Sequence, residues 1–121
     1  EAVRKVVSAV LSSERGKWLF SNSHSNARSE LVLSTLDGSD SARVVIDRTF
    51  VDLDGIRWIV DFKTGTHSGG SREQWLDSEW KRYLPQLMRY AKALAATERR
   101  KIKLALYFPF LDGWRSADYT G

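Results

Sequence analysis

The stretch VVIDRTFVDLDGIRWIVDFKTG, from Val44 to Gly65, predicts two β-strands joined by a turn at Gly55. Valine, isoleucine, phenylalanine and tryptophan dominate both halves, and these residue types favour strands. Charged side chains are rarely buried without partners, yet Asp47, Asp61 and Lys63 stand inside the apolar runs. The placement of these three charges is the feature of the sequence that most needs a physical explanation.

The register of the two strands decides whether the carboxylates meet. A two-residue Asp-Gly turn would leave Asp47 facing away from Asp61, because side chains alternate between the faces of a strand. A three-residue loop with Gly55 in the left-handed conformation would instead pair Asp52 with Ile56 and place the two carboxylates opposite each other. Local preference favours the first arrangement. A metal site requires the second, or a longer loop with an odd number of residues.

Two facing carboxylates repel each other unless a cation lies between them. A hard divalent ion such as Mg²⁺ prefers carboxylate and water oxygens. Lys63 shares a strand face with Asp61, so it would lie near a metal-bound water and stabilise charge developing on a phosphate. This set favours hydrolysis of a phosphodiester. In the alternative, Asp47 and Asp61 face solvent on an exposed sheet with Lys63 as an ion-pair partner, but the strand is apolar on both faces, as buried strands are.

The composition is that of one globular domain. The chain has 121 residues, of which 42% are hydrophobic, including five Trp, four Tyr and five Phe, enough for a single core. The absence of cysteine excludes disulfides, iron–sulfur clusters and thiolate zinc sites. No apolar run reaches the roughly 20 residues of a membrane span and no signal peptide is recognisable, so we expect a cytoplasmic protein without a membrane partner. The net charge of +4 and pI near 9.6 are compatible with polyanion binding.

Hydrophobic periodicity predicts the order α-β-β-β-α-β. One helix is expected from Ala2 to Leu11 with Gly16 as its stop, and another from Trp80 to about Thr97, with Pro85 in its first turn or at a kink. The predicted strands are 30–36, closed by an Asp37-Gly38 turn, 42–51, 56–63 and 101–110. Residues 21–29 and 64–78 are predicted as polar connectors and 111–121 as an irregular tail. We expect one domain over 1–121. Because the first residue is Glu1 and not Met, we expect it to be a fragment of a larger chain.

Three segments resemble the motifs of a known family. They are Asp47-Arg48, Ile59-Val60-Asp61-Phe62-Lys63-Thr64-Gly65 and Tyr83-Leu84-Pro85-Gln86-Leu87-Met88-Arg89-Tyr90-Ala91. In this order they resemble the RecB-type PD-(D/E)xK nucleases, most closely the C-terminal nuclease domain of AddA-like helicase–nucleases. The resemblance covers about 29–107. It implies the restriction-endonuclease-like fold, an α/β core of order α-β-β-β-α-β with a central mixed sheet flanked by helices.

The resemblance implies roles for individual residues. Asp47 and Asp61 would be metal ligands together with the backbone carbonyl of Phe62, and Lys63 would position or activate the attacking water. Glu30 matches the acidic residue that supports the site in this family.

Further support would come from the second predicted helix. Gln86 and Tyr90 share a helix face and match the motif that supports the site and the DNA strand, and Tyr83 and Arg48 are further candidates for substrate support. The implied activity is Mg²⁺- or Mn²⁺-dependent hydrolysis of a DNA phosphodiester in repair or recombination, either exonucleolytic or endonucleolytic on single strands. The implied partners are single-stranded DNA or duplex ends, and a helicase domain in the same chain or complex.

Several of these matches have ordinary structural alternatives. Glu30 can begin an exposed strand, and Gln86 and Tyr90 can be boundary residues of an amphipathic helix. For Arg48, an ion pair with a nearby acidic residue is expected in preference to a contact with phosphate. His24 and His67 are expected to be solvated. The basic cluster can either touch DNA or form a solvated strand entry without a partner; it consists of Arg99, Arg100, Lys101 and Lys103.

One departure from the family leaves three hypotheses. RecB-type domains generally carry a metal-binding His on an upstream helix, and the predicted first helix has none. Either the His-bearing helix lies outside this chain, or His24 replaces it, or the metal site is incomplete. The chain is accordingly a nuclease domain, a DNA-binding module of the same fold with a lost or incomplete catalytic site, or an interaction domain whose acids are exposed strand residues.

Overall fold

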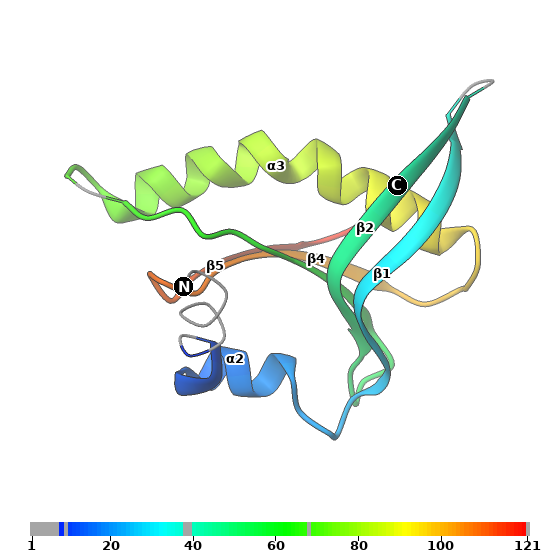
Figure 1. Ribbon diagram of the computed structural model, residues 1–121, viewed down its shortest axis with the longest axis horizontal. Coiled ribbons are helices and arrows are strands. Elements are labelled where there is room, and N and C mark those ends of the chain that lie inside the picture. Colours follow the sequence, from blue (N-terminus) through cyan, green and yellow to red (C-terminus); the bar gives the residue numbers. More distant parts are fainter. Residues whose placement is uncertain (1–7, 9, 38–39, 68, 121) are drawn as a thin grey trace.

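Figure 1 shows the computed structural model, which describes residues 8, 10–37, 40–67 and 69–120. A central sheet carries a long helix on one face and a short helix on the other. The elements in chain order are α2 (Glu14–Leu19), β1 (Ser25–Asp37), β2 (Asp40–Val51), β3 (Arg57–Phe62), α3 (Arg72–Ala95), β4 (Ile102–Phe108) and β5 (Gly113–Asp118). The mixed α/β class predicted from the sequence is confirmed. None of the helices in these ranges is both long and apolar enough to cross a membrane.

The sheet has the spatial order β1-β2-β3-β4-β5. Strands β3 and β4 are parallel, and the other neighbouring pairs are antiparallel. Parallel neighbours need a crossover, and α3 supplies it. Apolar side chains are buried on both faces of the sheet and form two cores. One lies under α3 and includes Ile59, Leu87, Leu104 and Leu106, and the other lies toward α2 and includes Leu19, Phe50, Trp58, Val60 and Tyr107.

The β2–β3 connection has the three-residue form that a metal site requires. Val51 pairs with Arg57, the amide of Asp52 donates to the carbonyl of Ile56 over 2.9 Å, and Gly55 has a φ of +81°. The preference of Asp-Gly for a two-residue turn is therefore overridden.

The reason lies in the side chain of Asp52. Its Oδ1 accepts hydrogen bonds from the amides of Asp54 and Ile56, over 2.9 and 3.0 Å, and its Oδ2 accepts one from Trp58 Nε1 over 2.8 Å. These bonds hold the pKa of Asp52 below its usual range, although burial opposes them. The loop is thus closed by a carboxylate that satisfies three donors.

Helix α3 begins at Arg72 and not at Trp80, so the prediction of a connector as far as residue 78 is wrong. Ser71 caps the helix by accepting a hydrogen bond from the amide of Gln74, which is the usual role of serine at this position. Pro85 lies well inside α3, on its exposed side and outside the first turn. Water can there satisfy the helix carbonyl that proline leaves without a donor.

Two further boundaries were predicted wrongly. Strand β1 begins at Ser25, inside the segment predicted as a connector. Its first part is irregular: Asn26 and Glu30 have positive φ angles of 48° and 51°, and the register shifts between Ser25 and Arg28. Such irregular strands lack clean alternation. The tail, predicted as irregular, contains β5, whose polar sequence GWRSAD carries little strand signal.

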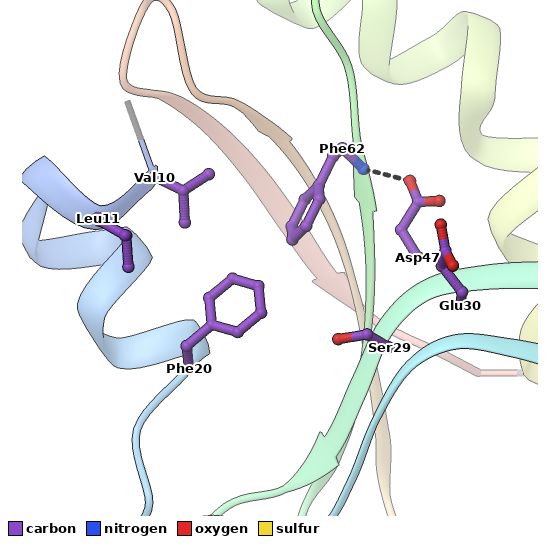
Figure 2. Close-up of a pocket in the computed structure, with 7 residues that line it drawn as sticks. All are labelled: Val10, Leu11, Phe20, Ser29, Glu30, Asp47 and Phe62. Atoms are coloured by element: carbon purple, nitrogen blue, oxygen red, sulfur yellow. Dashed lines mark hydrogen bonds between the residues drawn. The ribbon is translucent and has the colours of Figure 1, made fainter. Parts of the chain in front are cut away.

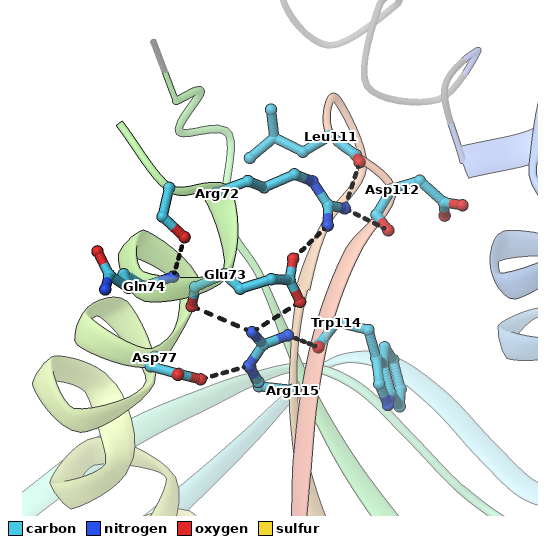
Figure 3. Close-up of polar contacts among 9 residues, drawn as sticks. Arg72, Glu73, Gln74, Asp77, Leu111, Asp112, Trp114 and Arg115 are labelled. Carbon is cyan, nitrogen blue, oxygen red and sulfur yellow. Dashed lines mark hydrogen bonds and ion pairs between the residues drawn. The ribbon is translucent and has the colours of Figure 1, made fainter. Parts of the chain in front are cut away.

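Ion pairs from α3 hold β5 in place (Figure 3). Arg115 Nε lies 2.8 Å from Asp77 Oδ1, and Arg115 Nη2 lies 3.1 Å from Glu73 Oε1. The hydrogen bond with Asp77 is the main cause that raises the pKa of Arg115. Arg72 donates to the carbonyls of Leu111 and Asp112, over 2.8 and 3.2 Å. The first turns of α3 are thereby joined to the β4–β5 hairpin.

The predicted first helix falls mainly outside the described residues, although residues 8 and 10–12 are helical. Gly16 is not its stop, because it lies inside α2 and is buried. A Cβ at Gly16 would stand 1.7 Å from the carbonyl oxygen of Val10, so only glycine allows this close approach. Ser13 caps α2 by accepting from the Gly16 amide over 2.9 Å. The predicted turn residue Gly38 lies outside the described residues, and Asp37 pairs with Asp40.

Candidate functional site

The two carboxylates that the sequence singled out meet where β2 and β3 part. Asp47 Oδ2 accepts a hydrogen bond from the amide of Phe62 over 2.8 Å, and Asp61 is 4% exposed. Burial and the neighbouring Asp61 carboxyl raise the pKa of Asp47 to about 7, although the Phe62 amide and Lys63 oppose the shift. The pair therefore retains a proton up to nearly neutral pH, as close carboxyls do.

Lys63 stands beside this pair. Its Nζ lies 2.9 Å from Asp61 Oδ2 and 3.9 Å from the ring centroid of Tyr83, which comes from α3. The ion pair predicted in the ordinary structural alternative is thus present. The exposed carboxylates of that alternative are not, because Asp61 is buried. Lys63 is not aligned for a hydrogen bond, and among the described residues the buried Asp61 Oδ2 receives none.

The donor set fits a hard divalent ion. Asp61 Oδ2 is a buried oxygen without a hydrogen bond donor, and Asp47 lies next to it. The N–H and C=O of one strand residue point to the same edge, so the Phe62 carbonyl projects toward Asp47. Within the described ranges, no three Asp, Glu, His or Cys side chains form a ready metal cage. An ion held here would keep several water ligands, as Mg²⁺ commonly does.

Glu30 reaches the same place from β1. Ser29 pairs with Arg48 and Leu31 with Ile46, so Glu30 stands across from Asp47. Figure 2 shows the two carboxylates side by side, with Glu30 on the outer side. Glu30 is exposed and has a φ of 51°, a backbone strain that is common at functional sites.

The residues of the helix motif lie along α3. Gln86 Nε2 donates a hydrogen bond to the hydroxyl of Tyr90, and Tyr90 is 7% exposed. Tyr83 lies one turn earlier and contacts Lys63. Among the described residues, no hydrogen bond or ion pair joins Gln86 or Tyr90 to the carboxylates, so of these three only Tyr83 reaches the charged group through Lys63.

Arg48 does not form the expected ion pair with any described acidic residue. Its Nε donates to the carbonyl of Leu19 over 3.1 Å, its Nη1 donates to Ser29 Oγ over 3.0 Å, and its guanidinium carbon lies 4.5 Å from the ring centroid of Phe20. Burial lowers the pKa of Arg48. Because side chains alternate along β2, Arg48 faces α2 and not Asp61.

The prediction that both histidines are solvated is wrong, because each contacts an aromatic ring. His24 Nε2 lies 2.6 Å from the Trp18 carbonyl, and its ring stacks on Phe50 with centroids 3.9 Å apart. These contacts engage His24 on the α2 side of the sheet, so it does not take the place of the missing ligand beside Asp61. His67 is half-buried against Trp75.

The basic cluster lies at the opposite end of the sheet from the carboxylates. Strand β4 pairs Lys103 with Trp58, near the start of β3, whereas Asp61 lies near its end. Lys101 and Lys103 form ion pairs with Asp118, and Arg100 forms one with Glu98, while Arg99 is exposed. The cluster therefore does not border the candidate site.

A cleft of about 510 Å³ opens beside the carboxylates (Figure 2). Its lining residues come from the helical segment before α2, from the C-cap of α2, and from β1, β2 and the end of β3: Val10, Leu11, Phe20, Ser29, Glu30, Asp47 and Phe62. The sequence did not single out Phe20, which lies between the predicted first helix and the connector 21–29, or Ser29, which lies at the end of that connector. Only the tertiary fold brings them to the carboxylates.

Comparison with known proteins gives no family for this chain. No protein-family model matches it, and no curated protein is significantly similar to it. Membership of the RecB-type nucleases therefore stays a hypothesis supported by the motifs and their geometry.

Proposed function

We propose that this chain is a metal-dependent DNA nuclease domain, similar to the RecB-type PD-(D/E)xK nucleases. The observation that carries the proposal is the pairing of Asp47 and Asp61 beside Lys63, in a register that the local Asp-Gly preference opposes. Two carboxylates and an amine at one buried point are suited to a divalent ion and a phosphodiester.

Residues of β2 and β3 would bind the metal ion. Asp47, Asp61 and the Phe62 carbonyl would hold Mg²⁺ or Mn²⁺, and Glu30 would support the site from its outer side. When bound, the ion lowers the pKa of a coordinated water and neutralises phosphate charge. Binding requires both carboxylates to be ionised, so the proton retained by the pair leaves to solvent.

Lys63 contributes a fixed positive charge. Its ammonium is held between Asp61 Oδ2 and the face of the Tyr83 ring, so it needs little reorganisation during reaction. There it orients the attacking water and stabilises the charge that develops on the phosphate oxygens. The water gives up one proton to solvent as its oxygen bonds to phosphorus and the bond to the leaving oxygen breaks, and the leaving oxygen takes up a proton from solvent.

The order of elements supports the finer fold proposal. The run α2-β1-β2-β3-α3-β4 has the α-β-β-β-α-β order of the restriction-endonuclease-like core, with β5 added at the edge. On the same analogy, we propose exonuclease action on single strands or duplex ends, a helicase domain as partner, a role in DNA repair or recombination, and a cytoplasmic location.

Cleavage assays with Mn²⁺ on single- and double-stranded DNA test this proposal. We expect Asp61→Ala and Lys63→Ala to abolish cleavage while circular dichroism shows an intact fold. Asp54→Ala and Lys81→Ala remove the same charges from exposed positions and should leave cleavage unchanged. Undiminished cleavage by both site variants would contradict the proposal.

A second candidate is a DNA-binding module of the same fold without catalysis. It is favoured by the absence of a ready three-residue metal cage among the described residues and by the engagement of His24 elsewhere. Salt-dependent DNA binding without Mg²⁺- or Mn²⁺-dependent cleavage would identify it.

A further inference from the structure

The cleft beside the carboxylates has apolar walls and an acidic rim. Val10, Leu11, Phe20 and Phe62 form apolar walls, whereas Glu30 and Asp47 stand at one side. Its volume of about 510 Å³ lies within the range of small-molecule sites. An acidic rim repels a phosphate that has no metal ion, so the part of a ligand that enters the apolar space should be uncharged.

Phe62 links this cleft directly to the proposed metal site. Its amide donates to Asp47 Oδ2 over 2.8 Å, and its ring points to the other side of β3, into the cleft. Because Phe62 follows Asp61 directly in β3, a ligand group that rests on the Phe62 ring would lie beside the carboxylates, as a nucleobase lies beside its own phosphate.

Phe20 packs beside Phe62 in the apolar wall and is partly exposed. It is 38% exposed, its ring centroid lies 6.2 Å from that of Phe62, and the planes are tilted by 48°. The guanidinium of Arg48 packs against it, with its carbon 4.5 Å from the ring centroid. Since Arg48 is itself fixed by Leu19 and Ser29, the ring is positioned before any ligand arrives.

We infer that this cleft is a nucleobase subsite, which takes the unstacked base of the nucleotide next to the phosphate at Asp47 and Asp61. This inference rests on the proposed function. A base in a duplex has both faces covered by its neighbours, whereas a single strand can present a face to an aromatic ring. The subsite therefore selects single-stranded nucleic acid without reading its sequence.

Fluorescence anisotropy tests the inference in a form that does not depend on cleavage. The probes are a labelled oligothymidylate and an abasic strand of the same length and charge, each in Ca²⁺, which takes the same oxygen ligands as Mg²⁺. We expect the wild-type chain to bind the base-bearing strand roughly tenfold more tightly than the abasic strand. Phe20→Ala should reduce this ratio to nearly one without weakening abasic binding, and Phe20→Tyr should retain it.

Phe110→Ala is the matched control, because Phe110 is also 38% exposed and lies outside the cleft. It should keep the tenfold ratio. If Phe20→Ala does not fold, Leu11→Asp provides a second variant, since Leu11 is 58% exposed and a charge there should also lower the ratio.

A ratio near one in the wild-type chain, a ratio unchanged in the cleft variants, or no binding of either strand would overturn the subsite. An equal loss in Phe110→Ala would do the same. If Asp61→Ala and Lys63→Ala cleave DNA as well as the wild type does, while the wild type keeps its preference for the base-bearing strand, only the proposed nuclease function is contradicted.

Discussion

The carboxyl pair should make the stability of the protein depend on pH in an unusual direction. In the folded chain the pKa of Asp47 is about 7, against 3.8 for an ordinary aspartate. A folded-state pKa above the unfolded value means that the native state binds more protons between these two values. The stabilisation is therefore complete below about pH 4 and is lost progressively as pH rises to about 7.

The size of this loss follows from the pKa of Asp47. The interval between 3.8 and about 7, at about 1.4 kcal/mol per pH unit, corresponds to roughly 4 kcal/mol. Asp47 is only partly buried, and solvent screening reduces this to about 2 kcal/mol. Asn at this position keeps the oxygen that accepts from Phe62 but carries no charge. Asp47→Asn should therefore be more stable than the wild type at pH 8 without metal, by roughly 8 °C in Tm.

Thermal melts of both proteins from pH 5 to 8, in EDTA, measure the effect. The lowered pKa values of Asp52 and Glu98 affect stability mainly below about pH 4, and both of these carboxyls are present in the wild type and in the variant. Asp54→Asn, an exposed carboxyl in the β2–β3 loop, should behave as the wild type. Adding Mn²⁺ at pH 8 should reverse the order by stabilising only the proteins that keep Asp47. The reasoning is refuted if the wild type and Asp47→Asn melt in parallel at every pH.

Two further predictions concern stability. Gly16→Ala should destabilise the fold by about 3 kcal/mol, because its Cβ would stand 1.7 Å from the Val10 carbonyl oxygen. Gly65→Ala is the control, since its Cβ would stand 3.5 Å from the nearest atom. Equal urea midpoints for the two variants would contradict the packing argument. Arg57→Met should cost about 3 kcal/mol, because Glu98 loses contacts of 2.7 and 2.9 Å and keeps the longer ion pair with Arg100, at 3.6 Å. The double variant with Glu98→Leu should recover most of that loss in the same denaturation assay, and no recovery would show that the ion pair is not the cause.

The apolar segments of the fold were predictable because burial on both faces leaves a strong pattern. The central strands β3 and β4 lie within one residue of the predicted 56–63 and 101–110 at their N-terminal ends. Strand β5 was not predictable, because what holds it is tertiary: Arg115 reaches Glu73 and Asp77 on α3. A polar strand secured by ion pairs from another element has no local hydrophobic signal.

The candidate site was predictable in composition but not in geometry. The sequence identified Asp47, Asp61 and Lys63, yet left two registers open. The register was decided by the side chain of Asp52, which closes the loop onto Trp58 and two amides. The sequence identified Glu30, Asp47 and Phe62 as site residues, but nothing in it indicated the cleft that they form with Phe20, because these residues are far apart in the chain.

The energetics of the carboxyl pair argue against a purely structural role. An aliphatic residue at position 61 would pack between apolar neighbours without any charge to desolvate, whereas Asp61 is 4% exposed and raises the pKa of its neighbour. Lys63 lies against one oxygen of Asp61, and Arg48, although adjacent in sequence to Asp47, is engaged on the opposite side of the sheet. Once the pair loses its retained proton, near neutral pH, Lys63 compensates one of the two negative charges, and no other described cation forms an ion pair with the second. A cation supplied from solution is the simplest compensation, and it converts a destabilising pair into a binding site.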